Sequence, residues 1–264
     1  MLLRTGILQF DICIGNREEN QRRVASWLEA TWTPSDAVTA IVLPEIWDVG
    51  YALEEKETVA DKDGQQALDF LGGLARKYNV WFVGGSVMTK TDEGFVNRAQ
   101  IINPRGELVN YYDKVHLIGL MGEDKHFLRG ARKCEFEIEG VKSAACICYD
   151  IRFCEWQRTF AVDGAEILFI SAEWPESRIE HWKALLKARA IENQMYVVAC
   201  NRVGTSKDTL FGGNSAVIDP LGRMLYAGGD KEEAAYVTFD TDKVRQTRSF
   251  LTVFGDRTPN LYFK

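Results

Sequence analysis

The chain lacks a long hydrophobic run. Its 264 residues contain no stretch that approaches the ~20 consecutive apolar residues of a membrane-spanning helix. The segment from Leu2 to Phe10 is apolar only briefly and is interrupted by Arg4 and Gln9, whereas a signal peptide has a longer apolar region followed by a cleavage site. These absences argue against a membrane protein and against export, so we expect a cytoplasmic protein.

The chain also lacks an excess of positive charge. Lysine and arginine together number 32 against 38 aspartates and glutamates, which gives a net charge of −6 and a pI of about 5.3. A general nucleic-acid-binding protein needs a basic face that neutralises phosphates. We therefore expect a small-molecule partner, and neither nucleic acid nor a membrane.

Patterns that bind metals or cofactors are missing as well. The three histidines, His116, His126 and His181, form no metal-ligand spacing with cysteines or carboxylates, and no glycine-rich phosphate loop of the Walker or dinucleotide type is present. The local signature of a papain-like Cys/His pair is absent too. Six cysteines are scattered through apolar contexts: Cys13, Cys134, Cys146, Cys148, Cys154 and Cys200. A chain of this length needs no disulfide framework. We expect reduced thiols, no metal and no cofactor.

No internal repeat or flexible linker divides the chain, which predicts a single domain over residues 1–264. Short β-rich runs alternate with longer helical patterns, which favours an α/β fold with mixed sheets and helices packed outside. The predicted strands are Thr5–Ile12, Ala40–Leu43, Val80–Met88, Val96–Asn103, Leu108–Tyr112, Val141–Cys148, Ile167–Ser171, Tyr196–Asn201, Ser215–Ile218 and Ala234–Phe239. The predicted helices are Glu18–Glu29, Gln65–Tyr78, Glu155–Val162 and Arg178–Asn193. Proline and glycine in Asn103–Gly106 and Asp219–Gly222 predict turns between antiparallel strands.

Two charged side chains follow apolar strands. Glu45 comes directly after Ile41–Pro44, and a carboxylate in apolar surroundings has a raised pKa that suits proton transfer near neutral pH. Lys114 comes after the strand Leu108–Tyr112, where an ammonium could stabilise an oxyanion or lower the pKa of a thiol. Taken alone, each residue is more often an ordinary solvated surface charge.

A cysteine ends a third apolar strand. Cys148 follows Val141–Ile147 and precedes the helix that begins near Glu155, an arrangement of strand, nucleophile and helix found in hydrolases. Cys146 lies two residues earlier and is expected to face the same side of the strand. Because Cys146 lies within the strand and Cys148 at its end, Cys148 is the better nucleophile. The alternative for either thiol is a small core residue.

These segments resemble a known family. Leu43-Pro44-Glu45, Tyr112–Leu117 and Ile147–Phe153 are similar, in this order, to the three motifs of the nitrilase-like carbon–nitrogen hydrolases. The resemblance extends over nearly the whole chain through Gln9-Phe10-Asp11, Val83–Ser86, His181–Asn193, Ala199–Gly204 and Phe211–Ser215. It implies a four-layer α-β-β-α sandwich, assembled into a homodimer or a larger homo-oligomer. The sequence departs from the family pattern at Cys154 and at Cys146, where a small residue such as glycine is common.

The resemblance also implies catalytic roles. It assigns Cys148 as the nucleophile that forms a thioester, Glu45 as general base and then acid, and Lys114 as the stabiliser of the oxyanion. Glu123 is similar to a second family glutamate that orients the substrate and Lys114, with a solvated surface charge as its alternative. The backbone N–H of Tyr149 is expected to be a further oxyanion donor.

The substrate expectation depends on two further segments. Leu120–Glu123 and Ile170–Pro175 resemble the ω-amidase-like branch of the family, in particular bacterial amidases associated with methionine salvage that act on 2-oxoglutaramate-type ω-amides. We therefore expect hydrolysis of a small ω-amide to an acid and ammonia. A nitrilase or an N-carbamoyl amino acid hydrolase would use the same three residues, and a non-catalytic binding protein is the alternative from a different class.

Residues after strand ends are candidates for the substrate pocket. Six are nominated by position: Trp47, Tyr51, Tyr149, Glu173, Trp174 and Asn201. An anionic substrate needs a local cation, because an unpaired buried carboxylate is costly. Arg178 and Arg202 are the candidates for that cation.

Overall fold

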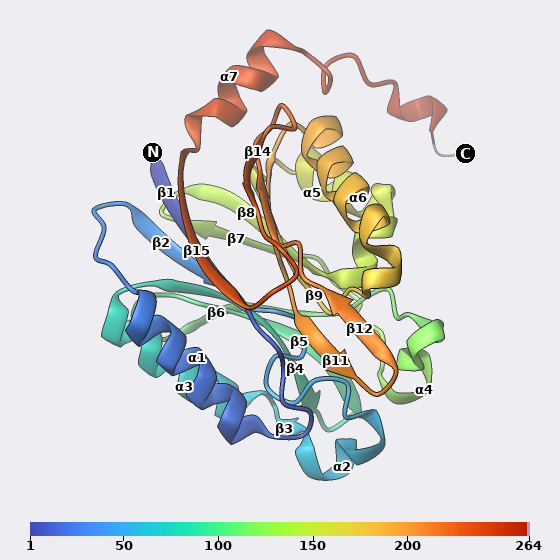
Figure 1. Ribbon diagram of the computed structural model, residues 1–264. Coiled ribbons are helices and arrows are strands. Elements are labelled where there is room, and N and C mark those ends of the chain that lie inside the picture. Colours follow the sequence, from blue (N-terminus) through green and yellow to red (C-terminus); the bar gives the residue numbers. More distant parts are fainter. Residues whose placement is uncertain (263–264) are drawn as a thin grey trace.

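Two β-sheets form the centre of the computed structural model, which describes residues 1–262 (Figure 1). The first sheet has, in spatial order, β15 (Glu233–Asp240), β1 (Leu2–Gln9), β2 (Val38–Val42), β4 (Trp81–Lys90), β5 (Phe95–Ile102) and β6 (Leu108–Asp113), with β3 (Asp61–Lys62) beside β4. The second has β14 (Met224–Ala227), β13 (Ala216–Ile218), β10 (Tyr196–Asn201), β9 (Ile167–Ala172), β8 (Val141–Ile147) and β7 (Cys134–Ile138). β11 (Val203–Ser206) and β12 (Thr209–Gly212) pair with each other. Parallel pairs at the centre of each sheet and antiparallel pairs at its edges make both sheets mixed, as predicted.

Helices cover the outer faces of both sheets. Figure 1 shows α1 (Arg17–Thr31) and α3 (Gln65–Tyr78) on one side, and α5 (Cys154–Val162) and α6 (Ile179–Asn193) on the other. The fold is therefore the predicted α-β-β-α sandwich. The remaining helices are α2 (Lys56–Val59), α4 (Glu123–His126) and α7 (Asp242–Phe250). The segment after α7 lies along one end of the molecule (Figure 1), where Phe254 packs against the core and the guanidinium of Arg158 on α5 lies over its ring.

Local sequence explains where the two helices of the first layer begin and end. The side chain of Asn16 accepts the N–H of Glu19 and caps the start of α1. α3 buries Ala67, Leu71 and Ala75, whose spacing of four residues forms one apolar stripe against the sheet. Asn79, with a φ of 53°, ends α3 in the left-handed conformation that asparagine tolerates.

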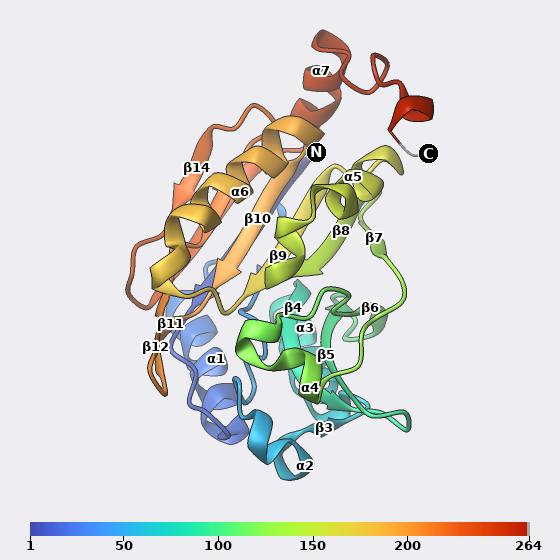
Figure 2. The same cartoon turned by 90° about the vertical axis from the view of Figure 1, so that its right-hand side faces the viewer.

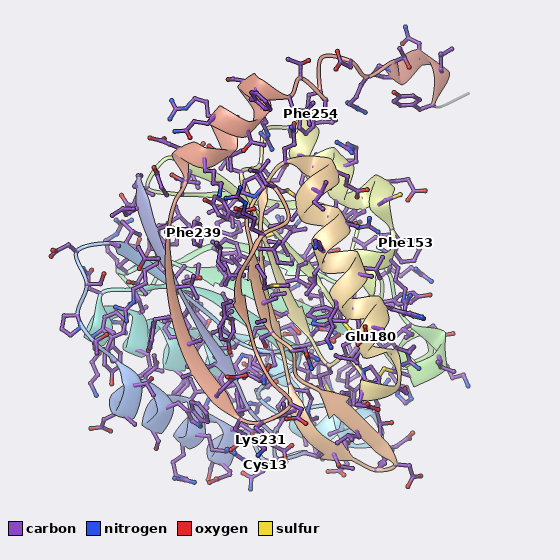
Figure 3. The ribbon with its side chains drawn as sticks, turned by 45° about the horizontal axis from the view of Figure 1, so that its top comes forward. Cys13, Phe153, Glu180, Lys231, Phe239 and Phe254 are labelled. Carbon is purple, nitrogen blue, oxygen red and sulfur yellow. The ribbon has the colours of Figure 1, made fainter. Side chains whose placement is uncertain are left out.

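The main core lies between the two sheets. β1 packs against β10, β4 against β9 and β5 against β8, and side chains fill the space between them (Figure 3). At one edge of this interface the ring of Phe239 on β15 stacks on Tyr196 of β10 with a centroid distance of 4.2 Å (Figure 3). Because apolar side chains of both sheets fill the space between them, polar groups can gather at the ends of the central strands.

The sequence-based elements compare well with the structure. Every predicted strand and helix is present, with ends displaced by a few residues, and both predicted turns join antiparallel strands. The prediction missed β3, β7, β11, β12, β14 and the helices α2, α4 and α7. Several of these are partly exposed: β7 alternates buried and exposed residues, and α7 buries only Val244 and Thr247. Such elements lack the continuous apolar runs on which the prediction depended.

No helix within residues 1–262 is long and apolar enough to span a membrane. The assignment of residues 1–264 to one domain stays a prediction, and its last two residues lie outside the described range.

Candidate active site

The candidate residues gather where strands of both sheets end. Glu45 lies three residues after β2, Lys114 directly follows β6, Cys148 directly follows β8, and Glu173 directly follows β9. Figure 2 shows the ends of β8 and β9 directed toward the segment that carries α4, whose first residue is Glu123. Residues far apart in the sequence therefore meet between the two sheets, as is common for sites at strand ends.

Lys114 lies at the centre of this group. Its Nζ is 2.7 Å from Glu45 Oε1 and 2.8 and 2.9 Å from the two oxygens of Glu123, and all three side chains are fully buried. Glu123 Oε2 also accepts the backbone N–H of Ile118 at 2.8 Å, which anchors the glutamate to its own segment. Both carboxylates predicted for the site therefore contact the same ammonium, and neither is the solvated surface charge that stood as its alternative.

Two uncharged side chains complete this cluster. The hydroxyl of Tyr51 is 3.0 Å from Oε1 of Glu45 and 3.0 Å from Oε1 of Glu123. The amide of Asn97 donates to Glu45 Oε1 at 2.8 Å and lies 3.3 Å from Glu123 Oε1. Tyr51 was predicted as a pocket residue, whereas Asn97 was not predicted to be in the site. No signal distinguishes Asn97 in the sequence, because β5 also contains the polar residues Arg98 and Gln100.

Burial and charge together determine the protonation of the cluster. Burial alone would lower the pKa of Lys114, but the Glu123 and Glu45 carboxylates outweigh it and hold its pKa well above the ordinary value. Burial raises the pKa of Glu123, and the Glu45 carboxylate adds to this while Lys114 opposes it. Lys114 is therefore a permanent cation in the site.

The thiol of Cys148 is protonated at rest. Burial raises the pKa of Cys148 well above its ordinary value; the Glu45 carboxylate raises it further, and Lys114 opposes the rise only in part. Of the two roles considered for Lys114, lowering the thiol pKa is thus not the dominant one. A thiol of this kind needs a base in contact with it before it can act as a nucleophile.

Cys148 lies in a sharp turn. β8 ends at Ile147, and Cys148 begins a 3₁₀ turn over Cys148–Arg152 with a φ of 45°, in the left-handed region that is unfavourable for a cysteine. Phe153 ends the turn before α5 (Figure 3). The strand therefore stops one residue earlier than predicted, and the expectation that Cys146 and Cys148 face the same side of one strand is wrong.

The two cysteines have different neighbours as a result. The charged and polar groups around Cys146 are Asp150, Gln157 and Arg189, toward the helical layer. The groups around Cys148 are Glu45, Lys114 and Glu123. Cys146 is a buried core residue, and Cys154 is exposed beside Glu155, so only Cys148 meets the charged cluster.

Asp150 holds the turn in place. Its Oδ2 accepts the backbone N–H of Ile147 at 2.9 Å and the hydroxyl of Tyr112 at 2.8 Å, and its Oδ1 accepts the backbone N–H of His116 at 3.1 Å. The ring Nδ1 of His116 lies 2.7 Å from the same Oδ1. A single buried carboxylate thus connects the turn after β8 to the segment that carries Lys114. His116 is therefore a partner of Asp150.

The two oxygens of Glu45 have unequal surroundings. Oε1 receives Lys114, Asn97 and Tyr51, whereas Oε2 receives the backbone N–H of Glu173 at 2.9 Å. Oε2 therefore has fewer hydrogen-bond donors than Oε1.

Arg202 is engaged within the protein. Its Nη1 pairs with Glu173 at 2.7 Å and its Nη2 with Asp11 at 2.7 Å, and the arginine is fully buried. The prediction of Arg202 as a candidate to bind a substrate carboxylate is wrong, because its guanidinium already pairs with two acidic side chains.

Trp47 also requires a correction as a pocket residue. The φ of Ile46 is 39°, so the chain turns sharply after Glu45. Trp47 is fully buried in the cluster beneath α1 and α3, where its ring lies 5.9 Å from Phe70. Glu45 and Trp47 therefore belong to different parts of the core although they are two residues apart.

The other nominated residues surround the turn. Asn201 accepts the N–H of Trp174 at 2.6 Å and donates to its carbonyl at 3.1 Å, so it orders the backbone after β9. The ring of Trp174 lies 4.6 Å from the guanidinium of Arg152, and Tyr149 is partly exposed in the turn after Cys148.

Within residues 1–262 neither Arg152 nor Arg178 forms an ion pair with a carboxylate, and both are partly exposed. In the same part of the chain no group of three His, Cys, Asp or Glu side chains is arranged to hold a metal ion.

Comparison with known proteins agrees with this geometry. The carbon–nitrogen hydrolase family model matches residues 4–249. A 2-oxoglutaramate amidase of Bacillus subtilis is 42% identical over 97% of both chains, and an ω-amidase of Escherichia coli K12 is 36% identical over 75% of both chains. A carbon–nitrogen hydrolase superfamily protein of Xanthomonas campestris has the same fold, with a TM-score of 0.91, 28% identity and 98% coverage of both chains. The predicted resemblance is confirmed, and the chain belongs to the carbon–nitrogen hydrolase family.

Proposed function

We propose that this protein is a thiol amidase that hydrolyses a short ω-amide bearing a carboxylate, of the 2-oxoglutaramate type. The observation that carries the proposal is the buried Cys148 thiol beside the Glu45–Lys114 ion pair. The substrate class is supported by the 2-oxoglutaramate amidase and ω-amidase relatives.

The first step is attack by Cys148. An amide carbon is a poor electrophile, and the thiol holds its proton at rest, so deprotonation and attack must occur together. Glu45 accepts the thiol proton while the sulfur bonds to the amide carbon. Oε2 is the accepting oxygen, because Oε1 is already occupied by three donors.

The tetrahedral intermediate carries a negative oxygen. Lys114 Nζ and the backbone N–H of Tyr149 are the donors that would stabilise it, and one such donor contributes roughly 3–4 kcal/mol to lowering a barrier. Glu45 then returns the proton to the amide nitrogen, the C–N bond breaks, and ammonia leaves. The acyl group remains on Cys148 as a thioester. Glu45 next removes a proton from water, and the water oxygen attacks the thioester. The acid leaves, and Glu45 returns its proton to the sulfur of Cys148.

Glu123 and Tyr51 maintain the charge balance of this site. Glu123 contacts Lys114 through both oxygens, and Tyr51 bridges Glu123 to Glu45. Together they hold Lys114 in one position while Glu45 gains and loses a proton, so the oxyanion donor does not move during turnover.

Arg152 is the best candidate to bind the substrate carboxylate. It belongs to the same turn as Cys148, lies over Trp174, and lacks an acidic partner among the described residues. A guanidinium positioned in this way can bind a carboxylate through two parallel hydrogen bonds. Arg178 remains the alternative because it too has no ion-pair partner within residues 1–262, whereas Arg202 is excluded by its existing pairs.

A screen of ammonia release tests the function. Purified protein is supplied with 2-oxoglutaramate, glutamine, asparagine, an aliphatic nitrile and an N-carbamoyl amino acid. We expect the highest kcat/KM for 2-oxoglutaramate. Preference for the nitrile or the carbamoyl compound would favour the other activities of the fold, and no hydrolysis of any compound would favour a binding protein.

Residence in the cytoplasm and assembly into a homodimer or larger homo-oligomer stay predictions; light scattering after size-exclusion chromatography tests the assembly.

A further inference from the structure

The catalytic set of the proposed function leaves one feature of the site without a role. Glu173 and Arg202 form a fully buried ion pair directly beside Glu45, although neither side chain contacts Cys148, Lys114 or Glu123 through a hydrogen bond. Burying two charges is costly unless geometry and additional hydrogen bonds compensate. A pair at this position therefore calls for an explanation beyond simple stability.

The connection to Glu45 runs through the backbone. The N–H of Glu173 donates to Glu45 Oε2 at 2.9 Å, and this is the donor on the oxygen that accepts the thiol proton. The carbonyl of the preceding residue, Ala172, accepts the backbone N–H of Glu45 at 3.4 Å and that of Arg202 at 3.1 Å. The peptide before Glu173 thus contacts Glu45 on one side and the strand that leads to Arg202 on the other.

The side chain of Glu173 determines where that peptide lies. Its carboxylate bonds Arg202 Nη1 at 2.7 Å, and Arg202 is itself held by Asp11 at 2.7 Å, the carbonyl of Ile12 at 3.2 Å and the carbonyl of Val203 at 3.1 Å. Because four partners hold the guanidinium, it is a fixed point. The length of the Glu173 side chain therefore determines how far its own N–H extends toward Glu45.

From this arrangement we infer that Glu173 and Arg202 are positioning residues that orient Oε2 of Glu45 toward Cys148. The inference rests on the proposed function, since it concerns the base of that mechanism. The charged or titratable groups around Glu45 are Tyr51, Lys114, Glu123, Cys148 and Glu173, and Arg202 pairs with Glu173. Among these, the segment of Glu173 is the one that contacts Oε2.

Two substitutions of Glu173 separate the effect of side-chain length from the effect of side-chain charge. Glu173→Asp keeps the charge but shortens the side chain by one methylene, so the ion pair with Arg202 survives only if the peptide moves away from Glu45. Glu173→Gln keeps the length and can still accept from Arg202. Burial raises the pKa of Glu173 to about 8, with Arg202 opposing the rise. The 2.7 Å bond from Arg202 can be accepted by the charged or the protonated carboxyl, so a neutral side chain of the same length is compatible with the site.

We expect Glu173→Asp to lower kcat about tenfold or more, because a hydrogen bond to a charged group is lost, with KM changed less than twofold. The acid limb of the kcat/KM profile should move to higher pH, since a carboxylate that loses a donor holds its proton more strongly. Glu173→Gln should retain more activity than Glu173→Asp. The matched control is Glu166→Asp: Glu166 directly precedes β9, as Glu173 directly follows it, and makes no contact with Glu45.

The inference is overturned if Glu173→Asp keeps the kcat and the acid limb of the parent, or if Glu173→Gln loses as much activity as Glu173→Asp. Should Glu173→Asp fail to fold, Arg202→Lys provides the same readout, because lysine keeps the charge but cannot span Glu173 and Asp11 together. The rate of Cys148 alkylation against pH is measured in parallel. If the parent hydrolyses no ω-amide, the proposed function fails, while the alkylation profiles of the parent and Glu173→Asp still test the positioning of Glu45.

Discussion

Replacing Lys114 with methionine should both stop catalysis and destabilise the protein. Methionine fills nearly the same volume, so the loss concerns charge and not packing. The ammonium bonds Glu45 at 2.7 Å and Glu123 at 2.8 Å in a fully buried position. Removing one oxyanion donor costs a factor of roughly 10²–10³ in kcat, and we expect a loss of at least that size for Lys114→Met.

The stability loss can be worked from the same contacts. Breaking a buried ion pair costs about 3–5 kcal/mol because the remaining charge is left unpaired. For a chain of this size that corresponds to a decrease in Tm of roughly 6–20 °C. Thermal unfolding followed by circular dichroism measures it. The matched control is Lys125→Met, which removes an exposed lysine two residues after Glu123 and should leave Tm and kcat nearly unchanged.

The destabilisation should depend on pH with a definite sign. The pKa of Glu123 is already raised by burial, and Lys114 opposes that rise. In Lys114→Met the pKa of Glu123 rises further. A carboxyl group whose pKa is raised in the folded state favours folding below its unfolded value, about 4.3, and this contribution is lost as pH rises through the folded pKa. The loss of Tm should therefore be smaller near pH 5 than near pH 8. A kcat within a few-fold of the parent, or an equal loss of Tm at both pH values, would refute the reasoning.

Three further predictions, made with five substitutions, test the site. Cys148→Ala should abolish turnover while the fold remains, and Cys146→Ala should keep substantial activity; ammonia release distinguishes them, and the reverse result would show that the nucleophile is misassigned. Glu45→Gln should lower kcat by ~10²-fold or more, because the amide cannot accept the thiol proton; burst kinetics should show no acyl-enzyme, and an intact burst would contradict this role. Arg152→Met should raise KM for 2-oxoglutaramate far more than for a neutral aliphatic amide; the same pattern in Arg178→Met instead would transfer the carboxylate site to Arg178.

Much of the fold was readable from short patterns. The central strands are apolar almost throughout because both faces are covered, and for that reason β4, β9 and β10 were predicted close to their observed bounds. The edge strand β7 was missed because Glu135 and Glu137 point to solvent and interrupt the apolar run. The family motifs then identified Glu45, Lys114 and Cys148 as residues of one site before any distance was known.

Sequence position was a weaker guide to the residues around them. Trp47 follows a strand as Tyr51 does, yet Trp47 packs beneath α3 while Tyr51 bonds Glu45 and Glu123. Arg202 lies after a strand end, but its charge is neutralised by acidic residues from distant segments. Asn97 lies within β5, where an amide gives no sign that it faces two carboxylates.

The sequence by itself determined most of the elements and the family, and it predicted the reactive residues, because these depend on local periodicity and on motifs whose residues are contiguous. Only the tertiary structure decided which side chains face one another. The neighbours of Glu45 come from β5, the segment after β6, α4 and the end of β9, separated by up to 128 positions in the chain. Burial and ion pairing hold the Cys148 thiol protonated and Lys114 charged. Both effects arise only in the folded assembly, because desolvation and Coulomb interaction depend on distances between segments and not on their order in the chain.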